Sequence, residues 1–515
     1  MFHKIMKVTA ALACFCGLTG FQPAQAEVLV PLQEYLNATP HWYKENSEGK
    51  YIIYVPQMRL AGDYIYIDDN VHVEPIELPV TVKNGNSYVN LETTTPVIGV
   101  NYTVDKGIGK VAPGQSRLER RPTVPMVEPV AWAFDPFTTT PYTERLNNSG
   151  DNIISPSWFT LGEKGLITNK AISPAYVQTY KDRKYQVWPL LTNKFDPKFT
   201  NAILKTPELW KTYAQQLAQY AYIYGFDGYN FDFENIYYKD STNLTNFVDY
   251  LSNTLHSYNI KTSIDVTGYS DSPDWSMVYD RKALSKSVDY VVLMAYDETW
   301  ASSTTAGPVA SYPWVKQHVT AMIKEVPPNK LVLGIPFYMR IWTVTDGKAK
   351  GKTLQIKDTS SYYTKYKNQI QWNDKLKADY LKIPISGAPT RTDLPNTNVG
   401  TNTTTTTNNT GVTSNISTTT DTVIPTNEGN VNDKGTVNNS NKSTAVVKTK
   451  TVVEEIWFEN NKSLSYKLDL VKEYNLAGFA AWRKGFEDTS TLELIQKAQM
   501  RKEETNTTLT KDVKK

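Results

Sequence analysis

Eight short apolar segments alternate with helical patterns between about residues 127 and 500, and this alternation constrains the fold more than any other feature. The segments lie at 127–134, 152–161, 185–192, 225–234, 261–268, 288–296, 330–337 and 476–482. Between them, apolar residues recur at helical spacing in 207–224, 242–258 and 313–326. Eight strands followed by helices predict an α/β fold, a (β/α)8 TIM barrel spanning residues 127–500.

The fourth segment, GFDGYNFDFE, carries polar side chains at every second position. Because side chains of a strand alternate between its faces, one face is expected to hold Phe226, Gly228, Asn230, Asp232 and Glu234, and the other Asp227, Tyr229, Phe231 and Phe233. Carboxyl groups two residues apart lie about 7 Å apart along a strand. Two such groups push their pKa values apart, so one can stay protonated as an acid.

Catalytic side chains of such barrels lie at the C-terminal ends of the strands, and Glu234 is expected to end the fourth strand. The polar face would then look into the barrel mouth. An edge strand with a solvated polar face is the structural alternative, but the bulky rings on the opposite face disfavour it.

A threonine- and asparagine-rich stretch interrupts the barrel pattern at about 390–450. It lacks the apolar residues needed to offset its ordering entropy, so we expect a disordered insertion between strands seven and eight. A small subdomain from 338–387 and 454–459 is expected to flank it. The charged tail at 501–515 is expected to be disordered as well.

Residues 27–122 form a separate, β-rich N-terminal module, with short strands expected at 64–68, 74–82 and 87–92. The region resembles the copper amine oxidase N-terminal-like modules of bacterial wall proteins, which are usually non-catalytic. Only His41 and His72 fall within it and they are far apart in the sequence, so no copper site is expected.

The first 26 residues have the pattern of a secretory signal peptide: basic residues, an apolar run, and a small-residue cleavage site ending at Ala26. Cleavage would remove Cys14 and Cys16, the only 2 cysteines of the chain. No later segment is apolar for long enough to span a membrane. We therefore predict an exported protein (secreted, periplasmic or associated with the cell wall) without disulfides.

Composition narrows the function further. The formal net charge of +3 gives no support for nucleic-acid or strong membrane electrostatics. The 33 tyrosines and 12 tryptophans suit a protein that stacks on sugars, although the same rings also fill cores. The 5 histidines include no pair at metal-ligand spacing, and no glycine-rich loop opens a helix after a strand. We expect no metal, nucleotide or other cofactor.

The motifs of the barrel carry a family resemblance. DGYNFDFE resembles the DGxDxDxE strand-four motif of family 18 glycoside hydrolases, the chitinase and endo-β-N-acetylglucosaminidase family. SPSWFTL, MAYD, GIPFYMR and GFAAW resemble the motifs of strands two, six, seven and eight, in that order. Within the family, VDYVVLMAYDE, GPVASYPWV and VPPNKLVLGIPFY are most similar to the bacterial branch of spore-cortex peptidoglycan N-acetylglucosaminidases.

The resemblance implies the role of each site residue. Family 18 enzymes retain anomeric configuration because the N-acetyl oxygen of the sugar attacks its own C1. Glu234 would be the acid and base, and Asp232 would hold the acetamido N–H. Tyr296 would aim the acetamido oxygen, Asp297 would contact hydroxyls or the acid, and Trp482 would form the floor under the sugar. From the residues alone, Tyr296 and Trp482 could equally be packing residues.

The motifs of strands six and seven add Met294, Tyr338 and Arg340 as substrate-binding candidates. Asn230, also expected to line the site, departs from the family because it replaces the middle Asp of the motif. An amide keeps hydrogen-bonding capacity but removes one charge and one proton-holding group. The departure puts in doubt the proton shuttling that a third carboxylate would allow.

Two kinds of protein fit these observations. The favoured one is an N-acetylglucosaminidase that acts on peptidoglycan or, second, on chitin-like glycans or the chitobiose core of N-glycans. The other is a non-hydrolytic, lectin-like wall protein, in which the N-terminal module provides wall association. Lectin-like relatives typically lose the acid, so Glu234 favours the enzyme. Endo and exo action both stay open.

Overall fold

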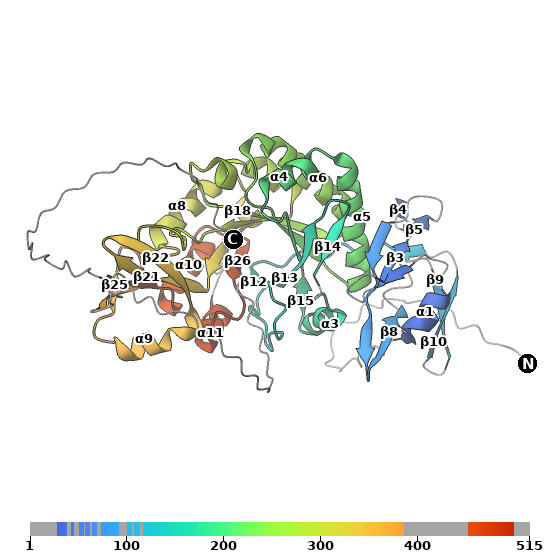
Figure 1. The fold of residues 1–515 in the computed structure, drawn as a ribbon, viewed down its shortest axis with the longest axis horizontal. Helices are drawn as coiled ribbons and strands as arrows, with labels where there is room; N and C mark the ends of the chain where they lie inside the picture. The colour runs from blue at the N-terminus through green and yellow to red at the C-terminus, as the bar shows by residue number, and fades with distance from the viewer. Residues whose placement is uncertain are drawn as a thin grey trace, which may run out of the picture.

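The computed structural model describes residues 28–38, 43–45, 51–55, 57–61, 64–68, 74–91, 100–105, 108–113, 117–169, 171–385 and 452–498. Figure 1 shows the barrel at the centre, a β-rich module beside helix α5, and a small sheet on the opposite side. The predicted signal peptide, the core of the threonine- and asparagine-rich insertion and the tail lie outside the described residues. The domain boundaries given above stay predictions.

The central sheet closes into a parallel barrel. In chain order its strands are β12 (Val130–Asp135), β13 (Asn152–Leu161), β15 (Tyr185–Val187) with β16 (Leu190–Thr192), β17 (Gly228–Asp232), β18 (Lys261–Thr267), β19 (Tyr290–Met294), β20 (Leu331–Pro336) and β26 (Gly478–Trp482). The barrel is closed because β12 pairs in parallel with both β13 and β26. The predicted (β/α)8 fold is confirmed. The third strand differs from the expectation, because it is split into β15 and β16.

Helices cover the outside of the barrel (Figure 1). They are α3 (Pro174–Asp182), α4 (Pro197–Leu204), α5 (Pro207–Tyr224), α6 (Ser241–Ser257), α7 (Arg281–Ser287), α8 (Tyr312–Met322), α10 (Asn461–Glu473) and α11 (Thr489–Lys497). Several of the helices begin or end at residues that commonly cap helices. Asp196 caps α4 through the backbone N–H groups of Lys198 and Phe199, and Gly225 ends α5 at a φ of 80°. Short helical turns lie at Tyr238–Asp240, Pro273–Met277, Pro328–Lys330 and Ile356–Asp358.

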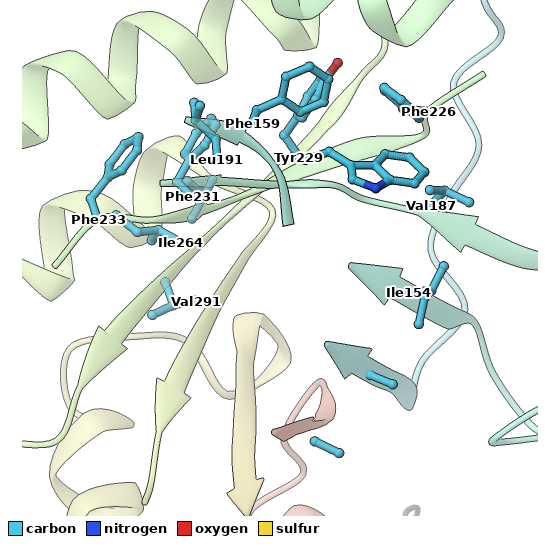
Figure 2. Close-up of a cluster of buried hydrophobic side chains, with 14 of the residues drawn as sticks. Ile154, Phe159, Val187, Leu191, Phe226, Tyr229, Phe231, Phe233, Ile264 and Val291 are labelled. Carbon is cyan, nitrogen blue, oxygen red and sulfur yellow. The ribbon is translucent and has the colours of Figure 1, made fainter. Parts of the chain in front are cut away.

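The barrel has two apolar layers, one inside and one outside. Trp132, Trp188 and Tyr290 belong to the inner cluster. The outer cluster, between strands and helices, includes the aromatic residues of the fourth segment. Figure 2 shows Phe226, Tyr229, Phe231 and Phe233 in this outer cluster, together with Phe159.

The placement of Phe226 corrects the expectation that it shares a face with Asn230. Its ring stacks on Tyr224 with an interplanar angle of 13° and contacts Tyr229 edge-on at 5.9 Å. The reason is that β17 begins only at Gly228, so the alternation of the strand does not extend back to Phe226. The expected outward position of Tyr229 and Phe231 is confirmed by their packing.

A five-stranded antiparallel sheet follows strand β20. Its order is β22 (Lys348–Gln355), β21 (Tyr338–Thr345), β25 (Val452–Phe458), β24 (Ala378–Ile385) and β23 (Gln371–Asn373), and α9 (Ser360–Lys365) lies between β22 and β23 in the chain. Ile385 at the end of β24 pairs with Val452 at the start of β25. The chain therefore leaves and re-enters the sheet at one place, on either side of the insertion.

The N-terminal region consists of small antiparallel sheets. Its elements are β1 (Leu29–Pro31), α1 (Leu32–Ala38), β2 (Tyr43–Glu45), β3 (Tyr51–Val55), β4 (Gln57–Ala61), β5 (Tyr64–Asp68), β6 (Glu74–Glu77), β7 (Thr81–Lys83), β8 (Asn86–Asn90), β9 (Val100–Asp105), β10 (Ile108–Pro113) and β11 (Arg117–Glu119). The Tyr220 hydroxyl of α5 accepts a hydrogen bond from the backbone N–H of Glu77 at 2.9 Å. Arg121 donates to the carbonyl oxygens of Ala221 and Phe226. These bonds tie the module to the barrel at α5.

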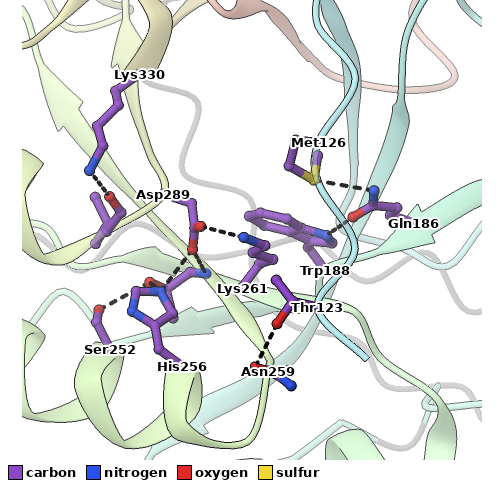
Figure 3. A network of polar contacts seen from close by, with 12 residues as sticks. Thr123, Met126, Gln186, Trp188, Ser252, His256, Asn259, Lys261, Asp289 and Lys330 are labelled. Atoms are coloured by element: carbon purple, nitrogen blue, oxygen red, sulfur yellow. Dashed lines mark hydrogen bonds and ion pairs between the residues drawn. The ribbon is translucent and has the colours of Figure 1, made fainter. Parts of the chain in front are cut away.

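The N-terminal, or bottom, end of the barrel carries a polar network. Asp289 accepts from Lys261 at 2.9 Å and lies 2.8 Å from Nε2 of His256, as Figure 3 shows. Trp188 donates to Gln186 at 3.0 Å in the same region. This end carries structural contacts, which leaves the opposite, C-terminal end as the place for a site. No helix in the described ranges is long and apolar enough to cross a membrane.

Candidate active site

Strand β17 directs two polar side chains into the barrel. Asn230 and Asp232 are both buried, while Tyr229 and Phe231 pack on the helix side. The strand ends at Asp232, so Glu234 lies two residues past its end and not at the end itself. This position leaves the Glu234 side chain partly exposed at the barrel mouth.

The backbone around Glu234 is held by two side chains that the sequence did not identify. The buried amide of Asn193, just after β16, donates to the carbonyl oxygen of Glu234 at 2.8 Å and accepts from its N–H at 3.1 Å. The hydroxyl of Tyr279 donates to the carbonyl oxygen of Phe233 at 2.8 Å. These three bonds fix the direction in which Glu234 leaves the strand.

Asn230 is bonded on both sides by residues of β18. The Ser263 hydroxyl donates to Oδ1 of Asn230 at 2.5 Å, and Nδ2 of Asn230 donates to Asp265 at 2.7 Å. Asp265 is a third carboxyl group in the barrel mouth; it is buried, and sequence reasoning missed it. The signal was present in SIDVT, where Ser263 and Asp265 alternate with apolar residues as in β17.

Burial raises the pKa of the three inward carboxyl groups, and neighbouring carboxylates add to this for Glu234 and Asp265. Burial raises the pKa of Asp232 to about 7. Burial, then the charges of Asp232 and Asp297, raise the pKa of Glu234 well above its usual range. Burial and the charge of Asp232 do the same for Asp265, against a hydrogen bond from Asn230 that lowers it. A site built this way holds protons near neutral pH, as acid–base chemistry requires.

Tyr296 follows strand β19 and lies in the same mouth. Burial raises its pKa well above the ordinary value, and the charges of Asp265 and Asp232 add to this effect. Its ring needs the absence of a side chain at Gly334 of β20, where a Cβ would lie 3.2 Å from Cε1 of Tyr296 and 2.5 Å from the carbonyl oxygen of Leu293. Met294, at the end of β19, is partly buried.

Asp297 has its carboxylate fixed from strand β21. The Tyr338 hydroxyl donates to Oδ1 of Asp297 at 2.8 Å, and the Arg340 guanidinium donates to the same oxygen at 2.9 Å. Asp297 also has a φ of 57°, a left-handed conformation that is uncommon outside glycine and that clusters at functional sites. The structure therefore brings these three predicted residues together.

Trp482 ends strand β26 and is partly exposed. Its ring lies 5.5 Å from that of Phe134 at the end of β12. A position at the C-terminal end of the eighth strand is compatible with a floor under a sugar ring. Its role stays a prediction, as do the roles of the other site residues.

Metal binding finds no support at this site. Across the described ranges, no group of three or more His, Cys, Asp or Glu side chains is arranged to hold a metal ion.

Acidic side chains gathered at the C-terminal end of the strands of a closed barrel are typical of the active sites of barrel enzymes. Residues 192–487 match the family described as Glycosyl hydrolases family 18. This match covers more than half of the chain, and the chain belongs to glycoside hydrolase family 18.

The similar curated proteins include two from Bacillus subtilis. An uncharacterized glycosylase of Bacillus subtilis, YvbX, is 26% identical over 358 residues, which is 67% of this chain and 84% of the relative. The cortical fragment-lytic enzyme of Bacillus subtilis is 21% identical over 299 residues, or 56% of this chain. The alignment covers 54% of that enzyme, so the chain spans about half of its length.

Solved structures share the fold. The spore cortex-lytic enzyme SleL of Bacillus cereus aligns over 85% of this chain and 86% of its own, with a TM-score of 0.52 and 15% identity. SleL of Bacillus megaterium aligns over 82% of this chain and 88% of its own, with a TM-score of 0.51 and 16% identity. At these identities the likeness establishes the architecture only.

Proposed function

We propose that this glycoside hydrolase is exported and cleaves the β-1,4 bond that follows N-acetylglucosamine in peptidoglycan, with retention of configuration by substrate assistance. The observation that carries the proposal is the grouping of Asp232, Glu234 and Tyr296 in one barrel mouth, with the pKa of each raised by burial. This set supplies a proton donor, a carboxylate for the acetamido N–H, and a hydroxyl for the acetamido oxygen.

In the first step, the protonated Glu234 carboxyl donates its proton to the glycosidic oxygen. The acetamido oxygen of the substrate attacks C1, the C1–O bond breaks, and an oxazolinium-type ring forms. Asp232 accepts the acetamido N–H and stabilises the positive charge that develops. Tyr296 donates to the acetamido group and keeps its oxygen aimed at C1.

In the second step, the Glu234 carboxylate takes a proton from water. The water oxygen attacks C1 from the face that the leaving group occupied, and the acetamido group reopens. The product keeps its configuration, and Glu234 regains its proton. One side-chain acid therefore suffices where most glycosidases need two carboxyl groups.

The choice of peptidoglycan is supported by the kind of relative that this chain resembles. Several are named as cortical fragment-lytic enzymes, and the similar structures include spore cortex-lytic enzymes. The proposed export is supported by the leader pattern of the first 26 residues. The N-terminal module is proposed to associate with the wall.

Digestion of three glycans tests the proposal: purified peptidoglycan, chitin oligomers, and a high-mannose glycoprotein, each followed by mass analysis of the new ends. The Glu234→Gln variant serves as the background control. We expect new reducing ends at N-acetylglucosamine in peptidoglycan. Cleavage of chitin or of the glycoprotein core, but not of peptidoglycan, would show that the proposed substrate is wrong. Binding of glycan without cleavage would favour the lectin-like alternative.

A further inference from the structure

Strands β17 and β18 place two carboxyl groups side by side in the barrel. The two strands pair in parallel, with Asn230 opposite Ser263 and Phe231 opposite Ile264. The next step along this register brings Asp232 beside Asp265. Both point inward because they lie two residues after Asn230 and Ser263, which bond to each other inside the barrel. Adjacent strands are about 4.8 Å apart, so the two carboxyl groups are neighbours.

Among the described residues, only one carboxyl oxygen of Asp265 has a hydrogen-bond partner. Oδ2 accepts from Nδ2 of Asn230, while Oδ1 is buried and has no hydrogen-bond partner among the described residues. The orientation of Asn230 is set by Ser263, whose hydroxyl donates to the amide oxygen and so turns the amide N–H toward Asp265. A buried acceptor without a donor is costly unless it carries a proton of its own.

The groups that face Asp265 are acids. The titratable groups that act on it or are acted on by it are Asp232 from β17, Glu234 beyond the end of that strand, Tyr296 after β19 and Tyr279 after β18. In the described part of the chain, no lysine or arginine forms an ion pair with Asp232, Glu234 or Asp265. Neighbouring buried carboxylates without a counter-ion cannot both be ionised near neutral pH.

We propose that Asp265 is the positioning residue that holds the proton which Asp232 releases when the acetamido group of the substrate binds. In the free enzyme one proton is shared between Asp232 and Oδ1 of Asp265. As the substrate N–H arrives, the O–H bond on Asp232 breaks and an O–H bond on Asp265 forms. Asp232 is then the anion that accepts the N–H, and no proton enters or leaves the site. The proton returns when the product leaves.

This inference rests on the proposed function, since it assumes an acetamido group in the substrate. It also accounts for the amide at position 230. The carboxyl group that the family motif places there is supplied here from the next strand, and Asn230 bonds to it. The departure at Asn230 would then relocate the proton-holding group and not remove it.

Exchanging the amide of Asn230 and the carboxyl group of Asp265 tests the proposal. Asp265→Asn should lower kcat/KM by roughly 10- to 100-fold, up to the lower end of general acid–base contributions because Asp265 acts through Asp232, and should change the shape of the pH profile. The double variant Asn230→Asp/Asp265→Asn keeps one amide and one carboxyl group in the same hydrogen bond and returns the carboxyl group to β17. We expect it to recover activity to within about 10-fold of the wild type. A double variant no more active than Asp265→Asn, with equal loss at every pH, would overturn the proposal.

A second readout does not depend on activity. With aspartate carboxyl carbons labelled with ¹³C, NMR titration should show two coupled steps for the pair in the wild type, and the upper step should be absent in Asp265→Asn. An unchanged titration of Asp232 in Asp265→Asn would contradict the proposal even if every variant cleaves glycan. If the wild type cleaves none of the three glycans, the proposed function fails while this titration still decides the role of Asp265.

Discussion

The amide of Asn193 holds the backbone of Glu234 on both sides, donating to its carbonyl oxygen at 2.8 Å and accepting from its N–H at 3.1 Å. The third strand of the barrel thus fixes the acid that the fourth strand presents. The amide is itself anchored, because it also donates to the Thr200 hydroxyl at 2.9 Å. Asn193 is therefore a positioning residue for Glu234.

Replacing Asn193 tests this relationship. Asn193→Ala removes both bonds, so we expect kcat to fall by roughly 10- to 100-fold, because small displacements of a catalytic group are costly, with KM much less affected. Steady-state kinetics on the cleaved glycan measure kcat and KM separately. Asn169→Ala is the control, because the amide of Asn169 also donates a hydrogen bond to a backbone carbonyl oxygen, that of Ser157, but at an exposed position. A rise in KM with unchanged kcat would contradict the positioning role.

Glu234→Gln should abolish most of the activity. The amide keeps the shape of the side chain but has no proton to give to the leaving group, so the rate should fall by roughly 100-fold or more. Glu208→Gln, at the exposed first turn of α5, is the matched control and should leave the rate unchanged. Near-normal turnover by Glu234→Gln would remove Glu234 from the mechanism.

The raised pKa of Asp232 predicts how stability depends on pH. The folded protein holds this proton up to a pKa of about 7, well above the ordinary value of 3.8, so the folded state binds more protons than the unfolded state between these values. Stability attributable to Asp232 is therefore lost as pH rises through this range. Asp232→Asn should raise the Tm by a few degrees at pH 8 and much less at pH 4.

Thermal unfolding at both pH values measures this difference, with Asp271→Asn, at an exposed position of the loop after β18, as the control. An equal change in Tm at both pH values would show that ionisation of Asp232 is not the cause.

The network at the bottom of the barrel predicts the opposite pH dependence. Burial raises the pKa of Asp289, but the hydrogen bond and charge of His256 and the charge of Lys261 outweigh it and lower the pKa to about 2. This stabilisation is present above the ordinary aspartate pKa and is lost as pH falls toward 2. Asp289→Asn should therefore destabilise by about 1–3 kcal/mol at pH 7, with activity retained.

Urea unfolding at pH 7 and near pH 2 measures this effect. Glu473→Gln breaks the more exposed pair with Lys316 and should change stability by less than about 1 kcal/mol. Loss of activity in folded Asp289→Asn would mean that the bottom network also shapes the site.

Most of the barrel could be predicted because the spacing of apolar residues in each strand and helix is visible within a short stretch of the sequence. The apolar strands and amphipathic helices recur in order, and Asn230 and Asp232 follow from the alternation of one strand. Phe226 was misplaced because alternation cannot tell where a strand begins. The end of the strand at Asp232 is set by pairing with Thr192 of β16, which lies 40 positions earlier in the sequence.

The residues that support the site could not be predicted in the same way. Asn193, Asp265 and Tyr279 come from other strands and loops, and Asn193 and Tyr279 are each isolated among ordinary residues in their own segments. Their importance arises only when neighbouring strands pair and set a register. Asp265 is the informative case, since Ser263 and Asp265 alternate just as Asn230 and Asp232 do.

Substrate assistance is the central claim, and the most direct measurement compares two glycans that differ only in the acetyl group. One is an N-acetylglucosamine oligomer that the enzyme cleaves, and the other is the same oligomer deacetylated at the sugar whose C1 is attacked. We predict cleavage of the first and none detectable of the second, because the nucleophile is missing. Efficient cleavage of the deacetylated oligomer, or a sugar trapped covalently on Asp232 or Glu234, would contradict the mechanism.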